Sequence, residues 1–541
     1  MAAEPPRPSR FPVTALLPVA IVLLAAALRL VGLHWGLPDR RHFFSYHPDE
    51  IFLLMPSVQS FAHGDWNPHF FNYGSLYLYL VGIPAVLSGV VHAASLAPLY
   101  LLGRTITAVL GIGTVAALYL ALRREDRSLA LVSALLLAVL PLHVINSHYA
   151  TVDVPATFFL VLAFAFALRS AQKPSLVTGL CAGLFVGLGA ATKYNAGLFL
   201  VPVLLAPLLA PPRQWRTSWL GSVLLGAAVG FTLGCPYFWT PDFRRGLLFE
   251  AQHMREGGTF AFTNAGAGWV YHLLHGLPVA LSLPLLVAVV LGIYVAFRLP
   301  SRAVRLSLLW VILYLFVIGF AKEWFIRYLL PLTPFLAVLA GSGLLWLWRA
   351  PRAKALRAAG AAVGLAVVGL TLLYTWGQTQ LLTGEDPRDR AWSSVGPVVM
   401  LSRGRVAVGL VSAPWFYSPP VAPYNAGEAT RRYFDELMRE THTVVTTGWD
   451  PAVLRAARPE LFFLSDLESR DLLRRHDPAA VSFVQELGAL YPYTCRFSRP
   501  PAPGAWLAPG RDWAPPDWLY SSPIITLYCS AESPDDGRLY F

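Results

Sequence analysis

Two adjacent carboxylates follow a histidine and a proline in the sequence His47-Pro48-Asp49-Glu50. This motif comes shortly after the first long apolar segment, residues 11–33. Ionisable groups beside a membrane-spanning segment are costly to keep there, and they are often functional. A carboxylate in this place can take a proton from a hydroxyl group, or it can hold a divalent metal ion through its oxygen atoms. The alternative is that Asp49 caps the helical run that follows it.

Asp153 is a second acidic residue on a short connection between two apolar segments, and the same connection contains His148. The carboxylate of Asp153 could share a divalent ion (Mg²⁺, Mn²⁺ or Zn²⁺) with Asp49, or it could position an acceptor group. Capping of the next helix is again the alternative. His47 and His148 are possible substrate contacts, although His148 could simply lie at the membrane interface.

Three cations also lie close to apolar segments: Arg104, Lys193 beside Tyr194, and Arg327 beside Tyr328. A cation at the centre of a spanning helix costs roughly 2.5–3.5 kcal/mol on insertion scales, whereas one near a helix end can extend to the interface. The other interpretation is a phosphate ligand, because arginine binds two phosphate oxygens at once and lysine supplies a point charge. We expect the three cations to contact a phosphate and the two tyrosines to contact substrate.

The composition places most of this chain in a membrane. Of its 541 residues, 55% are hydrophobic and 13% are charged, whereas soluble domains average about 25% charged residues. The net charge of +11 could suggest nucleic-acid binding in a soluble protein. Here much of the positive excess lies in short loops between apolar segments, where it sets the membrane topology. We therefore expect the lipid bilayer as a partner, and no nucleic acid.

About twelve segments are apolar enough to be candidates for membrane-spanning helices. Short loops rich in lysine and arginine mark the cytoplasmic side. They alternate correctly with pairs of apolar segments if residues 75–97 form an outer juxtamembrane helix that does not cross. The prediction is a polytopic α-helical membrane protein with about eleven crossings and a cytoplasmic N-terminus. This topology places the candidate acids and cations on one face, outside the cytoplasm.

Residues 377–541 have a different pattern, which predicts a small extracytoplasmic α/β domain after a transmembrane domain at residues 1–376. Cys495 and Cys529 could form a disulfide there if this part lies outside the cell. The pattern of the C-terminal part predicts strands at 406–411, 442–446, 460–464 and 524–528, and helices at 428–440 and 479–487.

A further segment, residues 235–275, is rich in aromatic residues and glycine, and it could be a flexible lid or an interfacial aromatic belt.

The ordered set of motifs resembles the C-type, polyprenyl-phosphate-dependent glycosyltransferases. It is most similar to glycosyltransferase family 39 and its bacterial relatives, which include protein O-mannosyltransferases and lipid A aminoarabinose transferases. The resemblance implies a GT-C-like helical fold, a sugar donor linked to polyprenyl phosphate, and inversion at the anomeric carbon. It covers residues 10–350, and the motifs that carry it are His47–Glu50 and residues 104–111, 141–153, 187–194 and 327–334.

The resemblance also implies roles for single residues. Asp49, with Glu50 beside it, corresponds to the catalytic acidic position of the family, and Asp153 to the second acidic position. Arg104, Lys193 and Arg327 correspond to positions associated with the donor phosphate.

The implied reaction moves a hexosyl or pentosyl group to an acceptor hydroxyl on the outer face of a bacterial cytoplasmic membrane. The acceptor could be a protein, a glycan or a lipid. The alternative function is a lipid or glycolipid transporter or flippase, for which charges near the membrane midplane and a duplicated half are expected.

Overall fold

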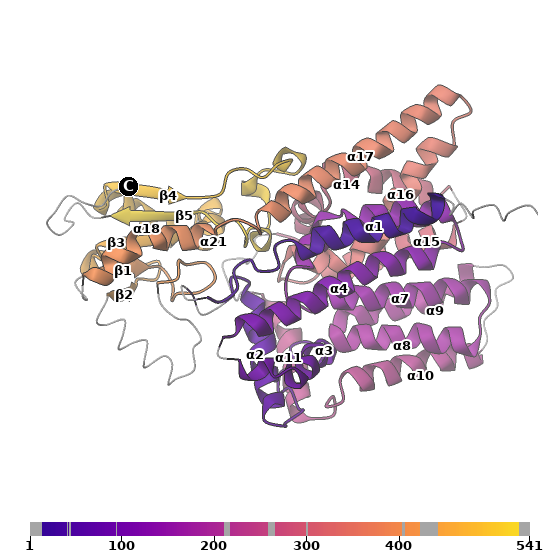
Figure 1. Ribbon diagram of the computed structural model, residues 1–541, viewed down its shortest axis with the longest axis horizontal. Helices are drawn as coiled ribbons and strands as arrows, with labels where there is room; N and C mark the ends of the chain where they lie inside the picture. The colour runs from indigo at the N-terminus through magenta and orange to yellow at the C-terminus, as the bar shows by residue number, and fades with distance from the viewer. Residues whose placement is uncertain are drawn as a thin grey trace, which may run out of the picture.

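The computed structural model of the chain has a helical part and a C-terminal α/β part. In Figure 1 the long helices lie side by side, and the sheet lies beyond one end of the bundle. Several helices are long and apolar, as in an integral membrane protein. The structure describes residues 13–39, 42, 45–93, 95–209, 217–257, 266–298, 301–402, 406–421 and 442–529.

The helical part extends to residue 380 and contains long helices with short helical turns between them. The helices are α1 (Val13–Leu30), α2 (Pro48–Ala62), α3 (Leu76–Leu87), α4 (Ala97–Leu122), α5 (Arg127–Ala138), α6 (Pro141–Asn146), α7 (Asp153–Gln172), α8 (Leu176–Thr192), α9 (Leu200–Leu205), α10 (Thr217–Gly234), α11 (Pro241–Glu256), α12 (Gly268–Val270), α13 (Leu277–Leu281), α14 (Leu283–Ala296), α15 (Arg302–Ile318), α16 (Thr333–Arg349) and α17 (Lys354–Gln380). The short turns are η1 (Val90–His92), η2 (Tyr194–Phe199), η3 (Ala206–Leu209), η4 (Tyr271–Gly276) and η5 (Ile326–Leu332).

Among the described residues, five helices are long and apolar enough to cross a membrane, or six if the bent pair around Ser282 counts as one span. Several other apolar helices are shorter, so the expected count of about eleven crossings stays a prediction. Helix α3 has 12 residues, which is about 18 Å of helix against a hydrocarbon core of about 30 Å. Its length agrees with the expectation that residues 75–97 do not cross.

Glycines bring α8 and α10 into close contact. Gly183 and Gly187 lie four residues apart on α8, and Gly226 and Gly230 do the same on α10. A Cβ atom on any of the four would lie 1.9–2.2 Å from a backbone carbonyl oxygen of the other helix. Small residues at this spacing let two membrane helices approach closely, so that backbone packing replaces the hydrophobic effect as the source of association.

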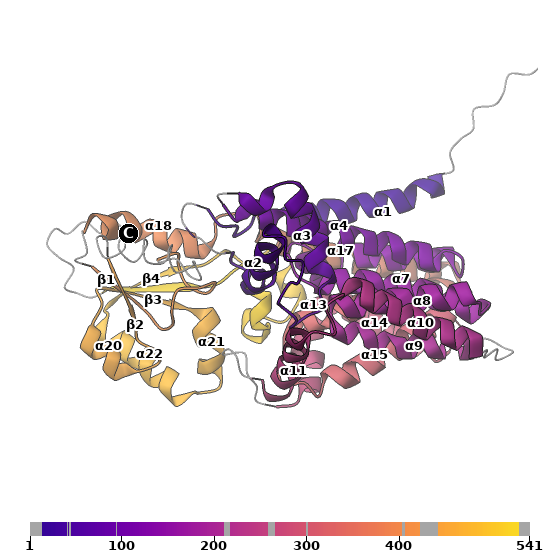
Figure 2. The same cartoon turned by 90° about the horizontal axis from the view of Figure 1, so that it is seen from below.

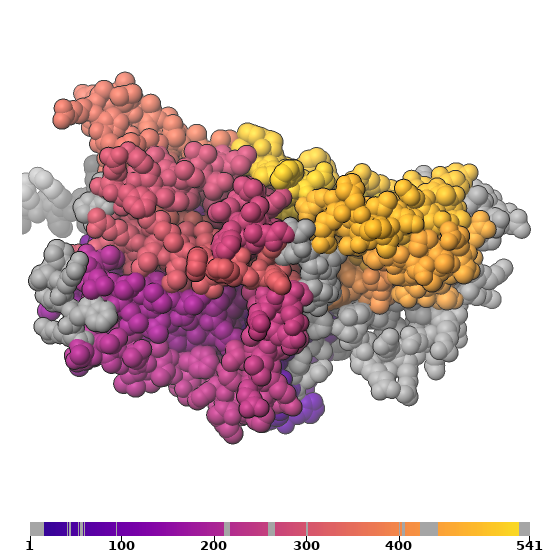
Figure 3. Space-filling model, turned by 180° about the vertical axis from the view of Figure 1, so that it is seen from behind, coloured from indigo at the N-terminus to yellow at the C-terminus, as the bar shows by residue number. Residues whose placement is uncertain are grey.

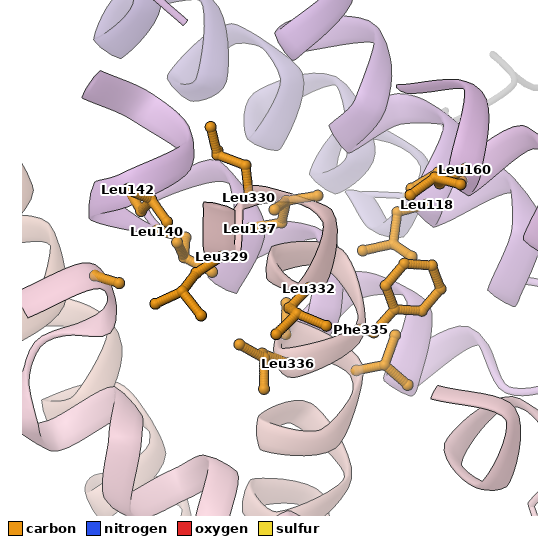
Figure 4. Packing of buried hydrophobic residues seen from close by; sticks show 14 of the residues in the cluster. Leu118, Leu137, Leu140, Leu142, Leu160, Leu329, Leu330, Leu332, Phe335 and Leu336 are labelled. Carbon is orange, nitrogen blue, oxygen red and sulfur yellow. The ribbon is translucent and has the colours of Figure 1, made fainter. Parts of the chain in front are cut away.

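The segment from η5 into α16 runs through the middle of the helical part and is almost completely buried. Figure 4 shows Leu329, Leu330 and Leu332 of η5 among leucines from neighbouring helices. Phe335 of α16 packs edge-on against Phe164 of α7, with ring centroids 5.2 Å apart. Because this core holds the segment on all sides, the residue near its start, Arg327, has a fixed position.

The C-terminal part is a five-stranded sheet with helices on both faces. Strands β1, β2 and β3 are parallel, and β5 is antiparallel to β3 and β4, in the order β2-β1-β3-β5-β4. Figure 2 shows α18 on one face and α20–α22 on the other. The elements are α18 (Pro387–Leu401), β1 (Ala407–Leu410), β2 (Thr443–Thr446), α20 (Pro451–Ala457), β3 (Leu461–Ser465), α21 (Asp466–Arg474), α22 (Pro478–Leu490), β4 (Tyr493–Phe497), η6 (Ala505–Leu507), η7 (Arg511–Trp513), η8 (Pro516–Trp518) and β5 (Ile525–Cys529).

Successive residues of β3 explain why both faces of the sheet are covered. Leu461 and Phe463 point into the core under α18, whereas Phe462 and Leu464 point into the core under α20 and α22. This alternation is the side-chain period of a strand, and a strand buried on both faces must be apolar at every position.

The predicted C-terminal strands and the helix at 479–487 are confirmed to within a few residues, whereas β4 was not predicted. The predicted helix at 428–440 lies outside the described residues. Cys495 and Cys529 are both free cysteines. They lie on neighbouring strands, but the partner of Cys529 in the register is Tyr493, so the two thiols are diagonal neighbours and the possible disulfide is not formed. The domain boundary at residue 376 stays a prediction, since α17 continues to Gln380.

Candidate functional site

Asp49 and Arg327 form an ion pair in the wall of a pocket of about 330 Å³. Nη2 of Arg327 lies 3.1 Å from Oδ2 of Asp49. The Asp49 side chain is 22% exposed, whereas that of Arg327 is 6% exposed. The pocket lies between both parts of the molecule, and it is lined by Pro48, Asp49, Leu53, Phe70, Asn72, Tyr73, Phe249, Glu250, His253, Phe325, Arg327, Tyr328, Trp415, Phe416 and Tyr520.

Arg327 keeps an unused hydrogen-bond donor at this pocket. Its guanidinium lies 3.9 Å from the centre of the Phe325 ring and 5.9 Å from that of Tyr328. Its Nη1 atom is buried and has no hydrogen-bond partner among the described residues. A buried polar group without a partner is costly, and an anion in the pocket would supply the missing acceptor.

Asp153, the second predicted acid, forms an ion pair with Lys193, one of the three predicted phosphate ligands. Nζ of Lys193 lies 2.7 Å from Oδ1 of Asp153, and both side chains are almost fully buried. The ammonium group also lies 4.8 Å from the centre of the Tyr328 ring and 5.6 Å from that of Tyr73. Because both tyrosines line the pocket, the Lys193–Asp153 pair lies directly behind the pocket wall.

Glu50 and Arg104 form a third pair, which is completely buried and does not line the pocket. Arg104 donates to both carboxylate oxygens of Glu50 at 2.8 Å, to Ser45 at 3.1 Å, and to the carbonyls of Leu33 and Trp35 at 2.7 and 2.6 Å. Burial alone would raise the pKa of Glu50, but the Arg104 guanidinium outweighs it and holds the pKa below its usual value.

Every nitrogen of the Arg104 guanidinium thus has a partner inside the protein. Neither residue lines the pocket, so the expected catalytic role of Glu50 and the expected phosphate contact of Arg104 stay predictions. The contacts of the pair support a structural role, and we propose that it holds α2 against α4 and against the loop after α1.

The two predicted histidines have different surroundings. The His47 ring lies 4.4 Å from the Tyr149 ring and 5.3 Å edge-on from the ring of Tyr520, a pocket residue. Burial lowers the pKa of His47 to about 4, so it is neutral near pH 7. His148 does not line the pocket, and its ring nitrogens contact the carbonyls of Val144 and Val31, at 2.9 and 2.8 Å. These contacts correspond to a structural role for His148.

The two predicted tyrosines also differ in position. Tyr328 lines the pocket directly. Tyr194 does not, but its hydroxyl donates to the carbonyls of Phe71 and Tyr73, at 2.9 and 3.0 Å. Tyr194 therefore positions the loop from which Tyr73 enters the pocket.

Sequence reasoning did not identify α11 as a wall of the pocket. Glu250 and His253 lie three residues apart on this helix, hence on one face, and both line the pocket. Burial raises the pKa of Glu250, although Lys193 and other nearby cations oppose the rise. A signal for this helix was present, because Thr240-Pro241 places a capping residue before a proline at the first helical position. The segment 235–275, for which the sequence left a flexible lid and an aromatic belt open, thus contains a regular helix.

Residues of the C-terminal part also help to build the pocket, and the sequence did not predict them. The carboxylate of Asp517 accepts hydrogen bonds from the backbone N–H groups of Ile326 and Arg327, at 3.1 and 3.3 Å. Burial raises the pKa of Asp517 to about 6. Arg388 bonds both oxygens of Asp386 at 2.7 and 2.8 Å and donates to the carbonyl of Tyr520 at 2.7 Å. These buried contacts join residues far apart in the sequence and place Tyr520 at the pocket.

The arrangement does not match a metal ion shared by Asp49 and Asp153. Each of the two carboxylates pairs with a different cation. Within the parts of the chain that the structure describes, no three His, Cys, Asp or Glu side chains come close enough to hold a metal ion. A metal held between the two acids would first have to separate both ion pairs.

Three solved structures are similar to this chain at low identity. ArnT from Cupriavidus metallidurans bound to undecaprenyl phosphate has a TM-score of 0.48 at 14% identity, over 97% of this chain and 100% of that one. AglB from Archaeoglobus fulgidus, in complex with an inhibitory peptide and a dolichol-phosphate, has 0.49 at 13%, over 88% and 73%. The S. cerevisiae Pmt1-Pmt2 complex bound to the sugar donor has 0.32 at 20%, over 47% and 36%. At these scores the likenesses transfer no function to this chain.

Among curated protein sequences, none matches this chain. Residues 101–239 match the model of one family, described as dolichyl-phosphate-mannose-protein mannosyltransferase. The matched range contains Arg104, Asp153 and Lys193, but not Asp49 or Arg327. The match confirms, within these residues, the resemblance to protein O-mannosyltransferases that the sequence motifs indicate.

Proposed function

We propose that this protein is a membrane glycosyltransferase that moves a sugar from a polyprenyl-phosphate donor to an acceptor hydroxyl, with inversion. The observation that carries the proposal is the Asp49–Arg327 pair, in which one group can accept a proton and the other has an unused donor for an anion. The family match over residues 101–239 supports the same reaction class. A carboxylate and an anion-binding arginine in one pocket are the two groups that this reaction needs.

In the proposed mechanism, Arg327 binds the donor phosphate through its unused Nη1. Charge on the leaving phosphate grows as the bond to the sugar breaks, and a fixed guanidinium stabilises that charge. Lys193 lies behind Tyr73 and Tyr328, so it adds positive potential at the pocket wall while it stays paired with Asp153.

Asp49 takes the proton of the acceptor hydroxyl as that oxygen attacks the anomeric carbon. It is the more exposed member of its pair, so an acceptor can reach it. The surrounding aromatic and apolar side chains would exclude water, which strengthens the electrostatic interactions in the pocket.

The proposed setting is the outer face of a bacterial cytoplasmic membrane, with the N-terminus cytoplasmic and the C-terminal part extracytoplasmic. The pocket lies at the end of the bundle that meets the C-terminal sheet, so the acceptor would enter on that side. The donor would carry a hexose or a pentose, and the acceptor would be a protein, a glycan or a lipid. The proposed division is a transmembrane domain at residues 1–376 and an acceptor-side domain at 377–541.

A transfer assay in membranes tests this proposal, using a panel of labelled polyprenyl-phosphate sugars and membrane extract as the source of acceptor. Wild-type protein should transfer label from at least one donor, and Asp49→Asn should lower the rate roughly 10²–10⁴-fold, the usual contribution of a general base. The matched control is Asp126→Asn, at the other end of the bundle, where Asp126 caps α5 and pairs with Arg349 at 2.6 Å. Equal turnover by wild type and Asp49→Asn at equal expression would refute the proposed base.

A further inference from the structure

A second cavity, of about 430 Å³, lies where one end of α17 meets residues 496–524. None of its described lining residues also lines the Asp49 pocket. Tyr374, Gln378 and Leu381 line it from the helical part. Figure 3 shows the C-terminal residues, in yellow, packed against the helical part at this junction.

The lining of this cavity is strongly cationic. Three arginines line it, Arg496, Arg499 and Arg511, and its described lining includes no Asp, Glu or His. Of the three, Arg511 alone has a carboxylate partner among the described residues, with its Nη2 2.6 Å from Oδ2 of Asp466. Within the described part of the chain, Arg496 and Arg499 form no ion pair. Two arginines therefore line one cavity whose described lining holds no acid, while Asp386 and Glu385, outside this lining, lie near enough to Arg499 to interact with its charge.

Arg499, which lines the cavity, has one hydrogen-bond donor without a partner among the described residues. Its Nη2 atom donates to the carbonyl of Gly384. Its Nε atom is buried and has no hydrogen-bond partner among the described residues. Arg499 is half-buried, but a buried N–H group without a partner is unfavourable, and a phosphate presents several acceptor oxygens in the geometry that arginine prefers.

The elements that line the cavity also carry exposed tryptophans. Trp376 on α17 and Trp506 on η6 are 47% and 70% exposed, although neither lines the cavity itself. Exposed tryptophans concentrate at the level of lipid headgroups. Val279, Leu381 and Leu519 give the same cavity an apolar side. An amphiphile with an anionic head could use both surfaces.

We propose that this cavity binds a phosphate group through Arg496 and Arg499, separately from the glycosyl-transfer pocket. The phosphate can be the headgroup of an anionic lipid or a free phosphate ion, since both present the same oxygens. The proposal does not depend on glycosyl transfer, because its residues lie outside the Asp49 pocket.

Binding to purified full-length protein in detergent tests the proposal. One arm titrates phosphatidylglycerol and counts bound lipid by native mass spectrometry, and the other titrates labelled inorganic phosphate in equilibrium dialysis. Both arms use an Arg327→Gln background, which removes the first anion site. The variant pair is Arg496→Gln/Arg499→Gln. The control is Arg455→Gln, an exposed arginine on α20 that pairs with Glu486.

We expect the double variant to raise the dissociation constant for at least one probe roughly tenfold or more, the scale of a lost charge-assisted hydrogen bond, with no change in the control. A change confined to phosphatidylglycerol identifies a lipid headgroup, and a change with inorganic phosphate identifies a free ion. If the double variant does not fold, Arg496→Gln alone, at an exposed side chain, carries the same expectation in the same direction. Unchanged binding of both probes would overturn the site.

Discussion

Asp49 and Glu50 are neighbours in the sequence and each pairs with an arginine, but the two pairs lie in different surroundings. The Glu50–Arg104 pair is completely buried, and every guanidinium nitrogen of its arginine has a protein partner. The Asp49–Arg327 pair faces a pocket, and Nη1 of Arg327 has no hydrogen-bond partner in the part of the chain that the structure describes. We infer that the Glu50–Arg104 pair, whose donors are saturated, holds elements together, whereas the unsaturated Asp49–Arg327 pair at the pocket is free to bind an anion and accept a proton.

Removal of one member of the Glu50–Arg104 pair should have the largest effect on the protein. Arg104→Gln leaves the Glu50 carboxylate buried without its counter-charge, which should destabilise the protein by about 3–5 kcal/mol or prevent folding. The measurement is the melting temperature and the folded yield in detergent. Arg349→Gln is the control, because its pair with Asp126 is partly exposed and should contribute about 1 kcal/mol or less. Equal melting temperatures for the two variants would contradict the structural role of Arg104.

A second prediction concerns Asp517, which holds the backbone at Arg327. Its pKa is raised to about 6 from a usual value of 3.8, so between these pH values the folded protein keeps a proton that the unfolded chain has released. Stability should therefore fall as pH rises from about 4 to 6, by up to about 3 kcal/mol from this residue. Asp517→Asn cannot release this proton, so it should lose that part of the pH dependence.

Melting temperatures of wild type and Asp517→Asn at several values between pH 4 and 7 check this expectation. The difference between the two proteins should change across that range and be constant above it. A difference that does not vary with pH would show that Asp517 titrates as it does in the unfolded chain.

A third prediction concerns Arg327, which lines the pocket. Arg327→Lys keeps the positive charge but removes the planar fork and the unused Nη1 donor. We expect roughly a tenfold to hundredfold loss in kcat/KM for the lipid donor, since one charge-assisted hydrogen bond contributes about 1.5–3 kcal/mol. Steady-state transfer rates at varied donor concentration measure it. Unchanged kinetics would mean that the fork of Arg327 does not contact the donor.

The sequence was sufficient to predict a helical membrane protein with a C-terminal sheet, because long apolar segments and alternating strands are local patterns. It also indicated Asp49 and Arg327, which the structure brings together. It could not separate Asp49 from Glu50. Adjacent residues on a helix point about 100° apart, and only the packing of α2 decides which carboxylate faces Arg104.

Tyr520 and Glu250 could not be predicted as pocket residues either, because their positions depend on contacts between distant parts of the chain. Tyr520 reaches the pocket because Arg388 and Asp386 dock the C-terminal part onto the loop after α1, where Trp35 donates to Asp386 at 3.1 Å. That contact spans 351 positions of the chain. Glu250 depends on where α11 lies across the pocket, which its amphipathic pattern alone does not determine.

The most direct test measures transfer rate and melting temperature for two isosteric variants, Asp49→Asn and Glu50→Gln. We predict that Asp49→Asn keeps the wild-type melting temperature within a few degrees and loses roughly 10²–10⁴-fold in rate. Glu50→Gln should instead lower the melting temperature strongly, with folded protein that retains activity. A folded, inactive Glu50→Gln together with an active Asp49→Asn would contradict the assignment of the two carboxylates.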